Sequence, residues 1–131
     1  MATTTTSISI NSPDISGDVI AINKQTQLRK AGVSTGLDQT TGVGKKITTS
    51  TDQHTLYPQA SYTDNAAHKV YIRVASNNVT EYVTLTIGSQ SVGRLYGNDF
   101  VFMPWDGTAD LKITPSVSTS LAIEHFLAFE V

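Results

Sequence analysis

The C-terminal end of the chain alternates between two sets of side chains with a period of two residues. One set is Leu121, Ile123, His125, Leu127, Phe129 and Val131, and the intervening set is Ala122, Glu124, Phe126, Ala128 and Glu130. This period is typical of a half-buried β-strand, whose successive side chains point to opposite faces. We therefore predict a strand that runs to the last residue, with the first set facing the core.

The same period continues upstream. Residues 68–87 contain two alternating runs on either side of Ser76-Asn77-Asn78, which predicts a hairpin with Tyr71 and Tyr82 across from each other. Shorter strands are predicted at residues 91–96, 100–103 and 111–114. Short strands separated by turns at this spacing predict an all-β, single-domain antiparallel β-sandwich with a jelly-roll-like arrangement.

The N-terminal half has a weaker strand pattern. Residues 5–10 and 19–22 are predicted strands on either side of a turn at residues 11–14, and residues 24–31 fit a strand or one helical turn. We expect residues 1–12 to form an extended N-terminal arm or edge strand, and residues 13–131 to form the sandwich domain. Residues 32–52 hold four glycines among Ser and Thr, with too few apolar residues for a core. They predict a long Gly/Thr-rich surface loop.

The net charge limits the partners of such a domain. Nine Lys and Arg stand against eleven Asp and Glu, a formal net charge of −2, which argues against a basic nucleic-acid-binding protein. No run approaches the ~18 apolar residues of a membrane-spanning helix, so no membrane partner is expected. The first ten residues lack the basic and apolar regions of a secretory signal. The chain is therefore expected to be made in the cytoplasm.

The patterns tested for nucleotide and metal binding are incomplete. The segment from Gly42 to Lys46 lacks the glycine spacing and the Ser or Thr of a phosphate-binding loop. His54, His68 and His125 are not spaced as joint metal ligands, and Asp52 with His54 would supply only two ligands. We predict neither a cofactor nor a metal.

The patterns tested for catalysis are equally weak. Asp99, Asp106 and Asp110 could supply paired carboxylates, but all three lie in or beside predicted turns, where Asp is favoured by local backbone hydrogen bonds. There is no cysteine to act as a nucleophile, and no Ser stands in a nucleophile elbow. We therefore predict that the chain is not an enzyme.

Hydroxyl-bearing and aromatic side chains supply the candidate interaction residues. The 13 Ser and 19 Thr predict a hydroxyl-rich surface, and the polar, β-prone Thr run near the start is suited to adding a strand to a neighbour's sheet. Exposed Tyr and Trp fit sugar stacking as well as packing or subunit contact, so both interpretations stay open. The candidate interface residues are Thr3, Thr4, Thr5, Thr6, Lys45, Lys46, Tyr71, Tyr82 and Trp105.

Charge is unevenly distributed along the chain. Residues 24–73 carry seven bases and three acids, a net charge of +4, whereas residues 74–131 carry two bases and six acids, a net charge of −4. Such a chain can meet copies of itself with opposite charges matched, and an ordinary mixed surface is the alternative. Lys45 and Lys46 lie in the basic part, so we expect them to contact an acidic region on a neighbour.

The second half of the chain also carries a family resemblance. It reads GRLYGNDFVFMPW at residues 93–105 and DLKITPS at residues 110–116, followed by a closing strand that ends in an acid. With the rest of residues 69–131, these segments resemble small virion proteins of tailed bacteriophages, particularly of marine and cyanobacterial phages. The resemblance implies a non-enzymatic structural protein located in the virion.

Within that family, the resemblance implies first a capsid decoration or cement protein that reinforces the shell through subunit contacts. The implied partners are the major capsid protein, or tail and portal components, together with further copies of the chain. One alternative is a tail, collar or fibre-attachment component. Another is a carbohydrate-binding module that aids adsorption to host glycans.

Overall fold

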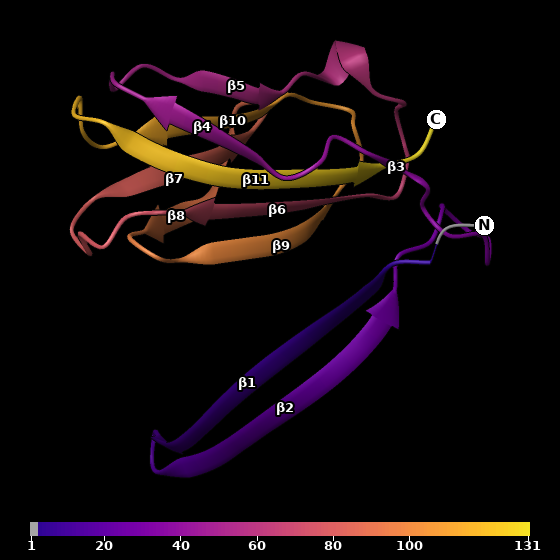
Figure 1. Ribbon diagram of the computed structural model, residues 1–131, viewed down its shortest axis with the longest axis horizontal. Helices are drawn as coiled ribbons and strands as arrows, with labels where there is room; N and C mark the ends of the chain where they lie inside the picture. Colours follow the sequence, from indigo (N-terminus) through magenta and orange to yellow (C-terminus); the bar gives the residue numbers. More distant parts are fainter. Residues whose placement is uncertain (1–2) are drawn as a thin grey trace. The chain divides into compact units, whose positions relative to one another are not determined.

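The computed structural model describes residues 3–131, and nearly all of their regular structure is β-strand (Figure 1). The chain divides into two compact units, one ending at Asp38 and the other spanning Gln39–Val131. The all-β antiparallel fold is confirmed. The predicted boundary after residue 12 is wrong, because the first strand continues beyond it to Ile15. Met1 and Ala2 of the predicted arm lie outside the described residues.

The first unit is built around a two-stranded hairpin. β1 (Thr5–Ile15) pairs antiparallel with β2 (Asp18–Gln27). Ser16 and Gly17 between them have φ values of 50° and 79°, as required in a two-residue turn that follows the strand twist. The turn predicted at residues 11–14 is wrong. Those residues belong to β1, where an irregular register between Ser12 and Ile15 accommodates a proline.

The second unit contains the remaining strands and one short helix. Its elements are β3 (Gln39–Thr40), β4 (Gly44–Thr48), β5 (His54–Tyr57), the 3-10 helix η1 (Gln59–Ser61), β6 (His68–Val74), β7 (Tyr82–Ile87), β8 (Gln90–Tyr96), β9 (Phe100–Trp105), β10 (Leu111–Pro115) and β11 (Leu121–Phe129). The strands form two antiparallel sheets, with the orders β5-β10-β7-β8 and β3-β11-β6-β9, and β4 also pairs with β11.

The pairing identifies the topology. β4 pairs with β11, β5 with β10, β6 with β9, and β7 with β8, so the chain runs back along itself like one long hairpin. Successive pairs alternate between the two sheets, which winds that hairpin into a sandwich. This is the arrangement of an eight-stranded jelly roll. The jelly-roll-like sandwich predicted from the sequence is confirmed for this unit.

The inward-facing side chains of both sheets form one hydrophobic core. The most deeply buried are Val70, Ile72, Val74, Val83, Leu111, Ile113, Leu121, Ile123 and Leu127. Each belongs to a period-two run, so the predicted core face of the last strand is confirmed. The strand ends at Phe129 instead of the last residue, and Val131 is exposed.

The hairpin predicted over residues 68–87 does not form. β6 lies between β11 and β9 in one sheet, whereas β7 lies between β10 and β8 in the other. The residues between them therefore cross from sheet to sheet. Tyr71 and Tyr82 lie on different sheets and do not face each other, which corrects the predicted cross-strand pair.

The loop predicted over residues 32–52 is partly strand. Gly44–Thr48 pairs with Leu121–His125 at the edge of a sheet, and the Thr48 hydroxyl donates to the Leu121 carbonyl over 3.4 Å. Edge pairing satisfies backbone groups without requiring an apolar side chain at every second position. A composition poor in apolar residues therefore did not prevent a strand here.

Candidate interaction surfaces

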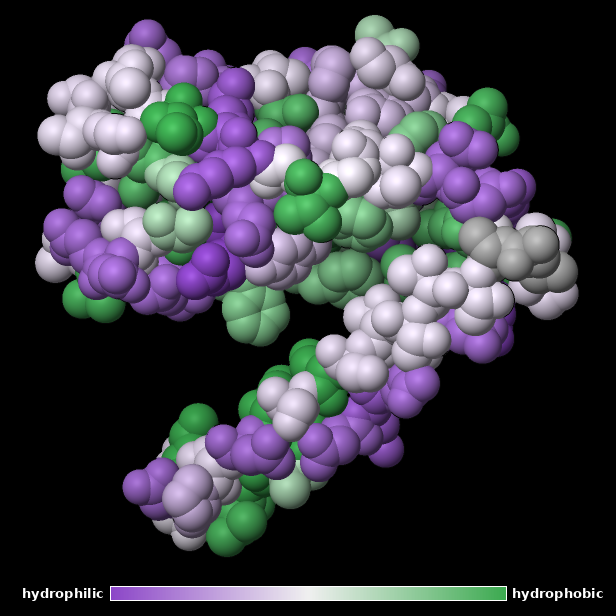
Figure 2. Space-filling view, viewed as in Figure 1, coloured by the Kyte–Doolittle hydropathy of each residue, from purple (hydrophilic) through white to green (hydrophobic). Residues whose placement is uncertain are grey.

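One face of the hairpin in the first unit carries four isoleucines together with Ser12 and Lys24. The register places Ile10 opposite Ile22, Ile8 opposite Lys24 and Ile20 opposite Ser12, all on the same side. Ile8, Ile10 and Ile22 are 49%, 46% and 40% exposed. We call Ile8, Ile10, Ile20 and Ile22 the isoleucine face; apolar side chains along β1 and β2 are visible in Figure 2.

The opposite face of the hairpin is mostly polar, and also carries Val19 and Ala21. Ser9 faces Asn23 across the strands, and its hydroxyl donates to Asn23 Oδ1 over 2.9 Å. Asn11 Nδ2 donates to the same Ser9 hydroxyl over 2.7 Å. The hairpin is therefore partly amphipathic: the side that carries the isoleucines also carries Lys24, and the polar side also carries Val19, which is 78% exposed.

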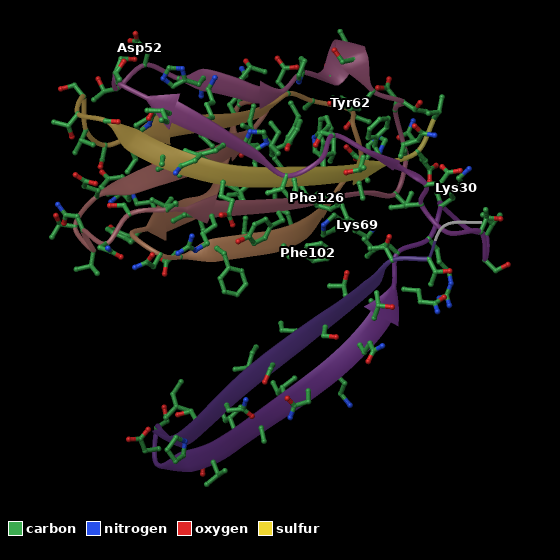
Figure 3. All side chains as sticks on the ribbon, in the orientation of Figure 1. Lys30, Asp52, Tyr62, Lys69, Phe102 and Phe126 are labelled. Atoms are coloured by element: carbon green, nitrogen blue, oxygen red, sulfur yellow. The ribbon has the colours of Figure 1, made fainter. Side chains whose placement is uncertain are left out.

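A second apolar surface lies on the outer face of the β11-β6-β9 sheet. Tyr71 of β6 stands between Phe126 of β11 and Phe102 of β9, and Phe100 follows on β9. Phe100 is 64% exposed and Phe102 is 37% exposed. We call these four residues the aromatic row; Figure 3 labels Phe126 and Phe102 on this sheet.

Charged side chains accompany the aromatic row. The Tyr71 hydroxyl donates to Glu124 over 2.8 Å, and Arg73 lies 4.0 Å from the other oxygen of that carboxylate. Burial and the hydrogen bond to Glu124 raise the pKa of Tyr71. Burial lowers the pKa of Lys69 on the same strand. The hydrogen bond to Glu124, which Arg73 also contacts, holds the Tyr71 ring in place within the row.

The two candidate lysines lie on β4. The register places exposed Lys45 opposite Glu124, which is also opposite Arg73 on the other side. Part of the acidic surroundings expected on a neighbour is thus supplied by the chain's own β11. Lys46 is half-buried, on the side of the strand opposite to Lys45.

The threonine run lies at the open end of the hairpin. Thr3 and Thr4 precede β1, and Thr5 and Thr6 pair with Gln27 and Thr26 of β2. The Thr4 carbonyl accepts a hydrogen bond from the Leu28 amide over 2.9 Å. One edge of the run is therefore already paired within the chain, and strand addition would have to use the other edge of β1.

Tyr82 lies on the outer face of the other sheet, beside Tyr96. Their ring centroids are 5.0 Å apart, and the Arg94 guanidinium lies 4.5 Å from the centre of the Tyr82 ring. Arg94 Nη1 also donates to the Tyr96 hydroxyl over 3.4 Å. This cluster is a small polar and aromatic surface separate from the aromatic row.

Trp105 is a core residue and is not available to a partner, contrary to the prediction. It is 2% exposed, and its indole Nε1 donates to the Ala109 carbonyl over 2.9 Å. Its ring contacts Tyr57, Tyr62 and His68 at the end of the sandwich. Val101 and Met103 lie on one face of β9. Extending this period of two residues to Trp105 would have predicted that its side chain faces the core.

The aromatic row and the isoleucine face were not among the predicted interface residues, apart from Tyr71. On β9, both alternating sets are apolar, with Phe100 and Phe102 in one and Val101 and Met103 in the other. Hydropathy alone therefore cannot tell which set is outside. Pro104 indicates only that this is an edge strand, because proline has no backbone N–H to donate to a neighbouring strand.

His125 and Tyr57 form the closest polar contact between aromatic side chains. The Tyr57 hydroxyl lies 2.7 Å from His125 Nδ1, and burial raises the pKa of Tyr57 to about 12. Gly44 leaves room for the imidazole, since a Cβ there would lie 2.7 Å from His125 Cε1. Burial, with Lys46 nearby, lowers the pKa of His125.

Lowering the pH should destabilise the fold through His125. Because its pKa is lower in the folded chain than the ordinary value of about 6.5, the unfolded chain binds the proton more strongly. The free energy of unfolding should therefore fall as the pH drops below about 6.5, and His125→Gln should reduce that fall. Denaturant titrations across the pH range measure it, with His54→Gln as the control for losing one imidazole. An unchanged pH profile in His125→Gln would contradict this role.

No further chemical centre stands out in the described part of the chain. Residues 3–131 contain no cluster of three or more His, Cys, Asp or Glu placed to hold a metal ion, and each buried side-chain polar atom among them has a partner. The only helix in that range is η1, and no helix there is long and apolar enough to cross a membrane. Comparisons with protein-family models, curated proteins and solved structures give no match to this chain.

Proposed function

We propose that this chain is a non-enzymatic structural protein of a bacteriophage virion that decorates the capsid shell. It would reinforce the shell by covering surface on neighbouring subunits. The resemblance to small phage virion proteins supports the proposal, since its residues 69–131 span β6 to β11 and so contribute to both sheets. A jelly roll is also an architecture that viral capsid domains use.

The observation that carries the proposal is the presence of two exposed apolar surfaces on a small chain. The isoleucine face and the aromatic row present large apolar side chains to solvent on regular, hydrogen-bonded strands. Exposed apolar surface of this kind marks contact with other macromolecules. Weak contacts suffice when many copies act together on one particle.

Reconstitution of depleted particles tests the proposal. Particles of the encoding phage, assembled without this chain, should bind the purified chain saturably over the whole shell and recover resistance to heat. Phe102→Ser should weaken binding, because it removes an exposed ring from the aromatic row while leaving the core intact. Val79→Ser is the matched control, since Val79 is exposed in the crossing between the sheets.

Two results would overturn this proposal. Binding confined to the tail would replace decoration by a tail or collar role. Binding to host glycans without binding to shells would favour a carbohydrate-binding module. A glycan array and electron micrographs of the labelled particles separate these outcomes.

A further inference from the structure

We infer that His68 is a proton-sensitive latch for the C-terminal end of β11, which releases the backbone of Glu130 when its imidazole takes up a proton. The contacts that carry the inference all lie within the second unit, between Gln39 and Val131. The inference concerns the purified chain and does not depend on the proposed virion role.

The first step is the tautomer of His68, the first residue of β6. Its side chain is fully buried, and both ring nitrogens have backbone partners. Nε2 lies 2.8 Å from the Thr63 carbonyl oxygen, which can only accept a hydrogen bond, so Nε2 carries the proton. Nδ1 accepts a hydrogen bond from the Glu130 amide over 3.2 Å, so Nδ1 is unprotonated. The two contacts together require the neutral ring.

The second step is the effect of an additional proton on these contacts. In the charged imidazole both ring nitrogens are donors. Nε2 keeps its bond to Thr63, but the new N–H at Nδ1 faces the N–H of Glu130, and two donors cannot bond each other. Leaving the Glu130 amide without this acceptor is costly, so the backbone there moves away from the ring. Protonation thus breaks one of the two contacts and preserves the other.

The third step is the charge around the ring. Asp106, in the turn after β9, interacts electrostatically with His68, and hydrogen bonds from Thr108 lower the pKa of that carboxyl. Because Asp106 is ionised, it favours proton uptake by the ring within the folded unit. Lys69, the next residue of β6, opposes proton uptake by its own charge, and the Glu130 carboxylate interacts with Lys69. The nearby charges therefore include one carboxylate on each side of the ring's own strand.

The fourth step is how far the release extends. The rings of Phe129 and Tyr62 pack against His68, with centroids 6.5 Å and 6.0 Å from it. Burial raises the pKa of Tyr62, so this ring adds no charge. Ala128 pairs with β3 on one side and with β6 on the other, and these backbone contacts do not depend on the imidazole. The release is therefore expected to loosen Phe129 and Glu130 and to stop at Ala128.

Amide hydrogen exchange of the wild-type chain, followed by NMR across the pH range, tests the latch. Protection of the Glu130 amide, relative to the intrinsic rate at each pH, should fall about tenfold per pH unit below about 6.5, where a solvated imidazole takes up its proton. The Ala75 amide, which donates to the Ala122 carbonyl over 2.9 Å at the other end of β11, should stay protected. Constant protection at Glu130 while the ring signals of His68 show protonation would overturn the inference. Equal losses at Glu130 and Ala75 would also overturn it, because they would mean that the whole unit unfolds.

Two variants separate His68 from the other buried imidazole. His68→Gln should make the protection of Glu130 independent of pH, because a side-chain amide does not titrate in this range. His125→Gln should leave the response of Glu130 as in the wild type, although it removes the contribution of His125 to the pH dependence of unfolding. A response that persists in His68→Gln, or that disappears in His125→Gln, would show that another group controls the chain end. The wild-type and His125→Gln measurements decide the question even if the His68→Gln chain does not fold.

Discussion

Leu127→Ala should lower the free energy of unfolding of the second unit by about 2–5 kcal/mol. Leu127 is fully buried in the middle of β11, which pairs with β6 and, in its first half, with β4. Truncation removes three carbons from the core and leaves a cavity that two hydrogen-bonded sheets cannot close. Equilibrium denaturation followed by tryptophan fluorescence measures the effect, since Trp105 belongs to the same core.

The control for this substitution is Val79→Ala, at an exposed position between β6 and β7. It should change the free energy of unfolding by no more than about 0.5 kcal/mol. If Leu127→Ala unfolded at the same denaturant concentration as the wild type, the assigned core face of β11 would be wrong.

Gly107→Ala should cost roughly 2–4 kcal/mol, from a strained backbone and a steric overlap. Gly107 has a φ of 78°, and a Cβ there would lie 2.5 Å from the Thr63 carbonyl oxygen and 3.1 Å from His68 Nε2. Those two atoms are themselves joined over 2.8 Å, so neither can move freely. Thermal or denaturant unfolding measures the loss.

Gly42→Ala separates the two causes. Gly42 has a similar φ of 73°, but a Cβ there would meet nothing within 4 Å. Its substitution should cost only the backbone component, about 1–2 kcal/mol. Equal losses in the two variants would mean that the packing around His68 is looser than described.

The sequence predicts individual strands better than their partners. Period-two runs correctly predicted β6, β7, β10 and β11. In a half-buried strand, apolar and polar side chains alternate whichever strand is paired with it. The asparagines at residues 77 and 78 look like a hairpin turn, yet the chain there crosses between sheets. Pairing in a jelly roll joins segments far apart in sequence, such as β4 and β11, so local signals cannot determine it.

Edge strands were the hardest to predict. In β4, Gly44 and Lys46 are half-buried, whereas Lys45 and Ile47 are exposed. A charged residue thus faces inward and an apolar one faces outward, the reverse of what a half-buried strand normally shows. β4 is a strand because its backbone pairs with β11. Every residue has similar backbone groups, so a hydropathy pattern cannot reveal this pairing.

The interaction surfaces could be predicted only in part. Alternation at Ile8, Ile10, Ile20 and Ile22 indicates strands, but period-two reasoning assumes that the apolar face is covered by the same chain. β1 and β2 form a sheet of two strands only, so the pattern could not indicate which surface covers their isoleucines. The same assumption hid the aromatic row, where both faces of β9 are apolar.

Electron cryo-microscopy of intact particles of the encoding phage is the most direct test of the proposed role. We expect density for the jelly roll of Gln39–Val131 repeated over the outer surface of the shell, with each β1-β2 hairpin in contact with protein. Shells without such density, or copies confined to the tail, would contradict the proposal that this chain decorates the capsid.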